Sequence, residues 1–268
     1  KKASAPTLEK KHDKYFLRFT YAEEVSLNKT PVKEQTICSV DLGINTDAVC
    51  TIMRPDGTIL GRKFINFPSE KDRMYRVLGR IRRFQREHGS RQVQGRWAYA
   101  KRLNTELGKK IAREIVFYAS ENRADVIVFE YLEMKGKLSG KKKQKLQMWR
   151  KRDIQKRCGQ QAHRKGIRIF RICAWNTSRL AFDGSGKIDR DIQDHRLCTF
   201  QNGKRYNCDL SASYNIGARY FIREILKPLP ATERSLLEAK VPAVKRRTSC
   251  VYADLRDLIS EMELQKAA

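Results

Sequence analysis

Two short apolar segments that each lead into an acidic residue constrain the fold of this chain most strongly. Residues 36–40 (Thr-Ile-Cys-Ser-Val) precede Asp41, and residues 126–129 (Val-Ile-Val-Phe) precede Glu130. A continuous apolar run such as residues 126–129 is typical of a central strand that is buried on both faces. The pattern therefore predicts a buried sheet in which two strands end in a carboxylate.

The segments around these strands alternate between strand and helix signals. Residues 48–53 and 58–67 are predicted strands on either side of the turn signal at residues 54–57, and they form an antiparallel meander with residues 36–40. The remaining predicted elements are helices at 71–88, 97–121 and 147–165 and strands at 14–21 and 166–172. This order predicts an α/β fold with a mixed sheet and flanking helices.

A third acidic residue stands beside a later helix. Asp209 directly precedes a predicted helix of about 17 residues that ends before Pro228. Residues 176–207 are rich in Gly, Asp and Asn and are predicted to be an irregular insertion. A basic linker and an amphipathic helix near residues 252–264 follow.

The charge balance points to a nucleic-acid partner. The chain has 57 Lys and Arg against 30 Asp and Glu, a net charge of +27 that is spread along the whole sequence. Distributed positive charge on a folded body favours binding to a nucleic-acid backbone, and an RNA-coating protein of ribosomal type is the simplest alternative. No apolar run approaches the roughly 20 residues that a membrane span needs, so a membrane protein is excluded.

Two basic segments are the candidate nucleic-acid contacts. The helix at 71–88 has few acidic partners at i,i+4 spacing, so its charges repel one another unless an anion lies against them. The loop at 135–145 is rich in Lys and Gly. The candidate contact residues are Arg73, Arg76, Arg80, Arg83, Lys141, Lys142 and Lys143.

The three acids suggest a site for divalent cations. Carboxylates at the ends of buried strands are poorly solvated and repel one another, and a hard cation with oxygen ligands relieves that repulsion. Two Mg²⁺ ions held by Asp41, Glu130 and Asp209 could support hydrolysis of a phosphodiester. A single Asp after a strand is more often a turn or cap residue, so the hypothesis depends on all three acids.

Three segments resemble the motifs of a known nuclease family. Residues 41–45 (Asp-Leu-Gly-Ile-Asn), 129–132 (Phe-Glu-Tyr-Leu) and 209–217 (Asp-Leu-Ser-Ala-Ser-Tyr-Asn-Ile-Gly) are similar to the three split RuvC motifs. The match is to transposon-encoded TnpB nucleases and their relatives, the type V CRISPR effectors. The resemblance covers roughly residues 36–226.

The resemblance implies an RNase H-like fold, a guide RNA, and Mg²⁺-dependent cutting of a DNA target, with Asp41, Glu130 and Asp209 as the metal-binding carboxylates. It also implies a prokaryotic cytosolic location and a longer parent protein, which agrees with the missing initiator Met. The expected organisation is the end of a guide-binding β-domain at 1–35, the nuclease domain with its first two motifs at 36–175, a degenerate zinc-ribbon-like insertion at 176–208, the third-motif helix at 209–228, and a C-terminal linker and helix at 229–268.

The cysteine pattern departs from that family. Its members carry two CxxC pairs between the second and third motifs, whereas here only Cys198 and Cys208 lie near that place. A structural zinc site needs four ligands, so we expect no zinc, although His195 and one acid could complete an unusual site. The seven scattered cysteines are expected to be reduced thiols.

Two other functions stay open at this stage. One is a relative that keeps RNA-guided DNA binding without effective cleavage, and the other is a guide-independent resolvase or RNase H-like enzyme. Asn215 is a candidate for supporting the site or the nucleic acid. Trp97, Trp149 and Trp175 could stack on bases, but we expect them to pack in the core.

Overall fold

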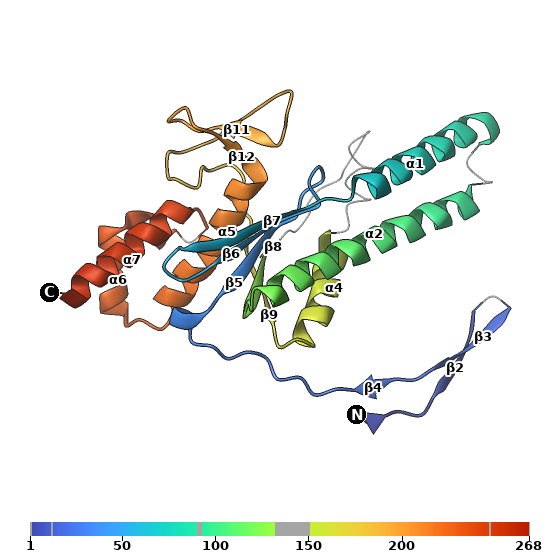
Figure 1. Ribbon diagram of the computed structural model, residues 1–268, viewed down its shortest axis with the longest axis horizontal. Coiled ribbons are helices and arrows are strands. Elements are labelled where there is room, and N and C mark those ends of the chain that lie inside the picture. Colours follow the sequence, from blue (N-terminus) through green and yellow to red (C-terminus); the bar gives the residue numbers. More distant parts are fainter. Residues whose placement is uncertain (1, 12, 90–92, 132–150, 247, 268) are drawn as a thin grey trace.

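The computed structural model describes residues 2–11, 13–89, 93–131, 151–246 and 248–267. A five-stranded sheet lies at the centre of the described chain, with helices on both of its faces (Figure 1). Across these ranges, no helix combines the length and the apolar character needed to cross a membrane.

The central sheet has the strand order β7-β6-β5-β8-β9. Its strands are β5 (Ile37–Asp41), β6 (Ala48–Met53), β7 (Ile59–Ile65), β8 (Val126–Tyr131) and β9 (Arg168–Cys173). The first three form the predicted antiparallel meander, and β5, β8 and β9 are parallel to one another. All residues of β5 and β6 are buried, as expected for strands at the centre of a covered sheet.

One face of the sheet packs against the C-terminal helices. Strand residues that alternate along β5 and β8, such as Ile37 and Val128, belong to a cluster with residues of α5 (Cys208–Leu226) and α7 (Tyr252–Ala267). The α5 helix crosses the sheet closely because residue 217 is glycine. A Cβ atom there would lie only 2.9 Å from the thioether of Met53 and 3.2 Å from Ser39 Oγ.

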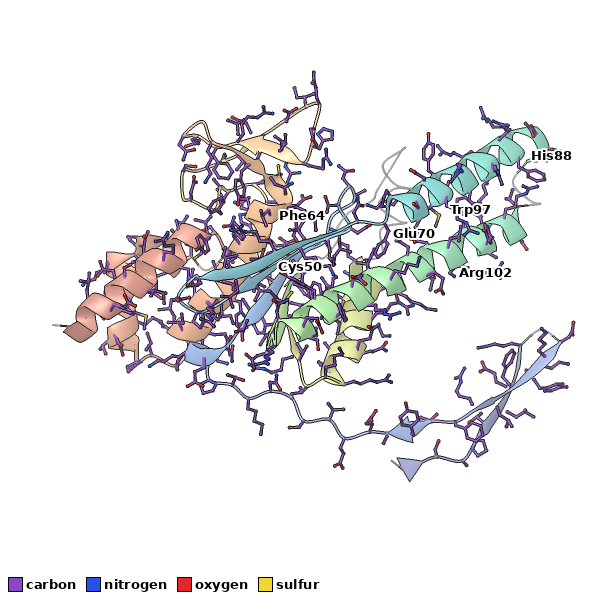
Figure 2. The ribbon with its side chains drawn as sticks, in the orientation of Figure 1. Cys50, Phe64, Glu70, His88, Trp97 and Arg102 are labelled. Atoms are coloured by element: carbon purple, nitrogen blue, oxygen red, sulfur yellow. The ribbon has the colours of Figure 1, made fainter. Side chains whose placement is uncertain are left out.

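The other face is covered by α2 (Gln94–Glu121) and α4 (Lys151–His163), which pack against strand residues such as Val40 and Phe129. The α1 helix (Pro68–His88) lies along α2, and together they extend beyond the sheet as a long hairpin (Figure 1). Trp97 is half-buried between these two helices with Met74 and Ile81 (Figure 2), which agrees with the packing role expected for it.

The N-terminal residues form an arm outside this body (Figure 1). It contains β1 (Lys2–Ala3), β2 (Thr7–Lys11), β3 (Lys14–Arg18), β4 (Tyr21–Ala22) and the 3-10 helix η1 (Val32–Glu34). Strands β2 and β3 form an antiparallel hairpin, and large apolar side chains such as Tyr15 and Leu17 are exposed on it. The single strand predicted at 14–21 is therefore divided between β3 and β4.

The insertion is more ordered than its composition indicates. Instead of an irregular segment, residues 176–207 include a three-stranded antiparallel sheet of β10 (Asp189–Arg190), β11 (Leu197–Thr199) and β12 (Arg205–Asn207). The Phe182 ring packs edge-on against Phe200 and Tyr214 and is tilted against Tyr206, at centroid distances of 4.9–5.6 Å. Strands of two or three residues are too short to produce a periodic pattern, which is why the sequence did not predict them.

Two further predictions about the C-terminal half are wrong in detail. Asp209 lies inside the first turn of α5 and not before it, because Asn207 is the N-cap residue and accepts a hydrogen bond from Leu210 N at 2.9 Å. The predicted linker contains α6 (Ala231–Lys240) and the 3-10 helix η2 (Pro242–Lys245). Leu237 is the one fully buried side chain of the short α6, so that helix carries little apolar periodicity.

The packing of α5 gives a stability prediction. Phe221 is 0% exposed in the cluster between α5 and the sheet, so Phe221→Ala leaves a cavity and is expected to lower the free energy of unfolding by about 3–5 kcal/mol. Leu236 on α6 is 62% exposed, and Leu236→Ala is expected to change it by no more than about 0.5 kcal/mol. Urea denaturation of both variants measures the difference, and equal losses would contradict this packing.

Candidate active site

Asp41 and Glu130 end two adjacent parallel strands. The register pairs Val40 with Phe129, so the two acids that follow are neighbours at the same edge of the sheet. Neighbouring strands are about 4.8 Å apart in a sheet, which makes this a close approach for two carboxylates. Both side chains are buried, with exposed fractions of 9% for Asp41 and 8% for Glu130.

Both carboxylates face α5. Side chains alternate along a strand, so Ser39 and Asp41 lie on one face of β5, and Ser39 Oγ borders Gly217 of α5. The same alternation places Glu130 on the side of Val128, whose contacts are also with the C-terminal helices. The hydroxyls of Thr51 and Ser213, 2.6 Å apart, fix the early turns of α5 over the same face.

Asp209 approaches from the first turn of α5. The loop that follows Asp41 bends over this turn: a Cβ at Gly43 would lie 2.4 Å from Thr46 O and 3.8 Å from Asp209 Oδ2. Thr46 also donates a side-chain hydrogen bond to the Asp209 carboxylate. Glycine at position 43 therefore allows the loop after the first acid to pack directly against the third acid.

The electrostatics of the three acids agree with this placement. Burial raises the pKa of Asp41 well above its usual value, and the charges of Glu130 and Asp209 raise it further. Burial also raises the pKa of Glu130 and of Asp209. Asp41 thus lies within electrostatic range of both other acids, although the three belong to distant parts of the sequence.

Lys151 supplies positive charge to this region. Burial lowers its pKa to about 8, while the charges of Glu130 and Asp41 act in the opposite direction. As the side chains stand, the described residues contain no group of three or more His, Cys, Asp or Glu arranged to hold a metal ion. The donor set nevertheless fits a hard cation, because it consists of buried carboxylate oxygens whose mutual repulsion a divalent ion would relieve.

A hydrogen-bonded scaffold behind Glu130 was only partly predicted. The Thr177 hydroxyl contacts Glu130 Oε1, and Asn215 Nδ2 donates to the carbonyls of Thr177 and Leu180 at 3.0 Å each. Asn215 Oδ1 also accepts from Tyr252 N at 3.0 Å, which ties α7 to the same residue. Asn215 therefore holds the backbone around Thr177, whose hydroxyl contacts Glu130; this is the first of the two roles left open for it, support of the site or of the nucleic acid.

The sequence analysis did not single out Arg219. It is 3% exposed, and its guanidinium donates to the carbonyls of Cys250, Cys173 and Trp175 at 2.7–3.0 Å. Its charge acts on the pKa of Glu130, lowering it against the effect of burial. The sequence did contain a signal for this residue, because Arg219 is the one charged residue in the otherwise apolar run from Ile216 to Ile222.

The structure describes only some of the predicted nucleic-acid contacts. The four arginines at positions 73, 76, 80 and 83 are exposed on α1, and Arg73 donates to the Tyr99 hydroxyl at 2.6 Å. The lysines at 141–143 and Trp149 lie outside the described residues. The expectation of core packing is wrong for Trp175, which is 66% exposed because it follows the end of β9 at the edge of the sheet.

The predicted zinc-ribbon remnant contains a thiol pair. Cys198 and Cys208 are buried and share a side-chain hydrogen bond, whereas His195 is exposed and contacts Asp191 O at 3.2 Å. Aromatic packing around Phe182 and Phe200 forms the core of this insertion in the described residues.

Asp41→Asn tests whether the buried charge of Asp41 destabilises the fold. The raised pKa of Asp41 means that its contribution to stability is present at low pH and is lost as the pH rises through the folded-state pKa. In EDTA at pH 7 we expect Asp41→Asn to have a higher melting temperature than the wild type, by about 2–4 °C for each kcal/mol gained in the free energy of unfolding. Near pH 3 the two proteins should have the same melting temperature.

Asp257→Asn, an exposed position on α7, is the matched control and should leave the melting temperature unchanged. A wild type that melts higher than Asp41→Asn at pH 7 in EDTA would show that the Asp41 carboxylate is not under electrostatic strain.

Comparisons with known proteins find solved structures with a similar fold but no sequence match. No protein-family model matches the chain, and no curated protein matches it by sequence. The solved structures that it resembles include the Cas12f1–sgRNA–target DNA complex, with a TM-score of 0.54 and 18% identity over 78% of this chain and 54% of that one. Another is the CRISPR-Cas12f ternary complex, with a TM-score of 0.49 and 15% identity over 79% of this chain and 44% of that one.

The chain thus spans about half the length of the Cas12f1 protein that it resembles. At this level of identity the likeness establishes the fold. The predicted class is confirmed: the chain is a mixed α/β protein whose five-stranded mixed sheet and flanking helices match those of Cas12f1.

Proposed function

We propose that this chain is the nuclease part of an RNA-guided DNA endonuclease. The observation that supports the proposal is that Asp41, in a chain with this fold, lies beside Glu130 at the end of adjacent strands and within electrostatic range of Asp209. The fold neighbour is a complex with a guide RNA and target DNA, and the net charge of +27 suits two polyanionic partners. Guide pairing would then read sequence while the protein holds backbones.

The three carboxylates are the residues that would hold Mg²⁺, as a pair of ions. Bound Mg²⁺ supplies charge stabilisation for the hydrolysis of a phosphodiester bond. The chain itself holds Asp41 at the end of the buried strand β5 and Asp209 in the first turn of α5. The Thr177 hydroxyl contacts Glu130 and orients it. Lys151 balances part of the carboxylate charge when no cation is present.

The first test of this function is Asp41→Ala. RNA that co-purifies with the chain is sequenced, and plasmids with and without the complementary target are incubated with Mg²⁺. We expect the wild type to cut only the matched plasmid, and Asp41→Ala to bind it with unchanged affinity and to leave it uncut, because it lacks one ligand of the cation.

Asp257→Ala removes an exposed carboxylate on α7 and should cut like the wild type. Normal cleavage by Asp41→Ala would remove this acid from the mechanism. Guide-dependent binding by a wild type that never cuts would favour a non-cleaving, RNA-guided DNA-binding protein of the same family.

Thr177→Val tests the positioning of Glu130. The substitution keeps the shape of the side chain but removes the hydroxyl that contacts Glu130 Oε1, so Glu130 loses its fixed orientation. Loss of such a supporting contact typically costs 10–100-fold in metal affinity or activity, and we expect a loss of that size in the cleavage rate, partly recovered at high Mg²⁺. Thr177→Ser retains the hydroxyl and should restore the rate, whereas equal rates for Val and Ser would contradict this role.

A further inference from the structure

Two polar side chains on one face of α5 connect the end of the sheet to the start of α7. Asn215 and Arg219 are four positions apart, so they lie on the same face of the helix. Both are buried, with exposed fractions of 0% and 3%. Each hydrogen-bonds to the segment 173–180, which follows β9, and also to residues 250–252 at the start of α7. The two side chains therefore join the same pair of segments.

The segment after β9 leads from the sheet to Glu130. The register of β8 and β9 places Glu130 opposite the penultimate residue of β9. Arg219 Nη1 donates to the carbonyls of Cys173 at 3.0 Å and Trp175 at 2.7 Å, where the chain leaves the sheet. Two residues after Trp175, the Thr177 hydroxyl contacts Glu130 Oε1. Arg219 thus holds the backbone between the end of β9 and the residue that touches this acid.

The backbone of this segment makes a turn that needs support. Asn176 has φ of 60°, in the left-handed region that few residues other than glycine adopt. Its neighbours on both sides are held by α5, because Trp175 O accepts from Arg219 and Thr177 O accepts from Asn215. A conformation of this kind persists only where the surrounding contacts fix it. The turn that presents Thr177 to the acid therefore depends on both side chains.

The burial of Arg219 has a cost that an apolar side chain would avoid. Its Nη2 atom is buried and has no hydrogen-bond partner in the part of the chain that the structure describes. A buried polar nitrogen without a partner destabilises a fold, and a well-packed apolar side chain is often at least as stable as a buried charge. Glu130 lies within electrostatic range of the guanidinium. An arginine at this position is better explained by its effect on the site than by packing.

We propose that Arg219 is a positioning residue for Glu130: it fastens the turn after β9, and with it the Thr177 hydroxyl, to the start of α7. The inference rests on the proposed function, in which Glu130 holds a cation. It also gives α7 a part in the site, because the same guanidinium donates to Cys250 O at 2.8 Å. When the turn loosens, Glu130 loses the contact that orients it, and the site loses affinity for the cation.

The first measurement is hydrogen exchange of the chain in EDTA, for the wild type and Arg219→Gln. The amides of residues 179–181 donate to backbone carbonyls of the insertion, so their exchange reports whether this turn is closed. We expect exchange in peptides that cover residues 173–181 to be about tenfold faster in Arg219→Gln, the change expected when one or two hydrogen bonds are lost. Peptides from α2 should exchange at the rate of the wild type.

The second measurement is the affinity for Mn²⁺, read from the electron paramagnetic resonance signal of the free ion. Arg219→Gln should bind Mn²⁺ roughly 10- to 100-fold more weakly than the wild type. Arg219→Lys keeps the charge but lacks the planar fork of donors, so it should recover only part of the affinity. All proteins are compared below their melting temperatures, and Arg219→Lys replaces Arg219→Gln if the latter does not fold.

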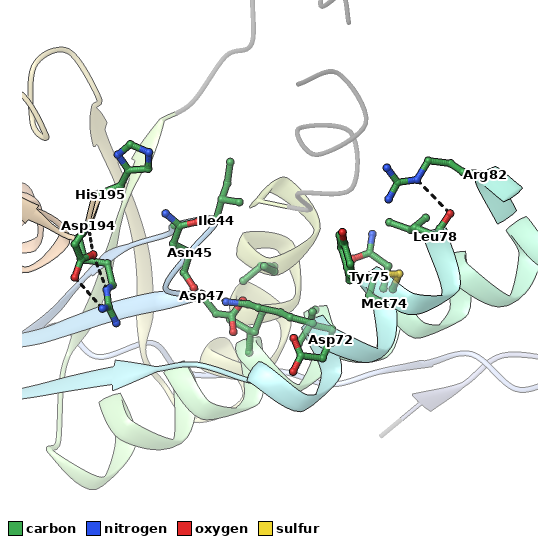
Figure 3. Close-up of a pocket in the computed structure, with 18 of the residues that line it drawn as sticks. Ile44, Asn45, Asp47, Asp72, Met74, Tyr75, Leu78, Arg82, Asp194 and His195 are labelled. Atoms are coloured by element: carbon green, nitrogen blue, oxygen red, sulfur yellow. Dashed lines mark hydrogen bonds and ion pairs between the residues drawn. The ribbon is translucent and has the colours of Figure 1, made fainter. Parts of the chain in front are cut away.

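Two variants serve as controls. Arg223→Gln makes the same change of charge one turn later on α5, where the side chain is 48% exposed. Tyr75→Ala alters a side chain that lines a cavity of about 780 Å³ beside the loop at 43–47 (Figure 3). Arg219 and the segment 173–180 do not line that cavity. Both controls should match the wild type in exchange and in Mn²⁺ affinity.

The outcomes separate this inference from the proposed function. Folded Arg219→Gln that binds Mn²⁺ within twofold of Arg223→Gln overturns the positioning role, whatever its exchange. Full recovery of affinity by Arg219→Lys also overturns it, because charge would then suffice without the carbonyl contacts. A wild type that binds no Mn²⁺ contradicts the proposed cation site, and exchange at residues 173–181 then decides alone whether Arg219 fastens this turn.

Discussion

The repulsion between buried carboxylates at the end of adjacent parallel strands is the constraint on which the rest of the structure depends. Ionised groups that lose water and face like charges are unstable unless a partner compensates them. Here the strand register itself brings Asp41 beside Glu130, and the crossing of α5 adds Asp209. Lys151 and Arg219 supply opposing charge, but burial still raises the pKa of each acid.

A fold that tolerates this arrangement must hold it rigidly. The site is held by contacts between segments that are far apart in the sequence: Ser213 with Thr51, Asn215 with residues 177–180, and Arg219 with the ends of β9 and the segment before α7. Ser213, Asn215 and Arg219 all belong to α5, which is buried along almost its whole length. The α5 helix therefore supports the candidate site and also carries the last of its three acids.

Much of this could be predicted from the sequence because it depends on local patterns. The apolar runs before Asp41 and Glu130 indicated buried strands, and the helical periodicity of α1 and α2 was clear. The pairing of β5 with β8 joins segments about 90 residues apart, and no local signal specifies it, so the convergence of the acids rested on a family resemblance. Lys151 lay unnoticed within a predicted helix because its role depends on what the fold places opposite it. Trp175 was misjudged because aromatic residues usually pack in cores, whereas this one follows an edge strand.

The central claim is that the three acids form one site for divalent cations, and crystals of the chain soaked in Mn²⁺ test it most directly. Mn²⁺ takes the oxygen ligands that Mg²⁺ takes and has an anomalous signal that locates it. The account predicts anomalous density bridging Asp41, Glu130 and Asp209, with the Lys151 ammonium displaced from them. Well-ordered acids with no density between them, at a concentration that saturates cleavage, would contradict it.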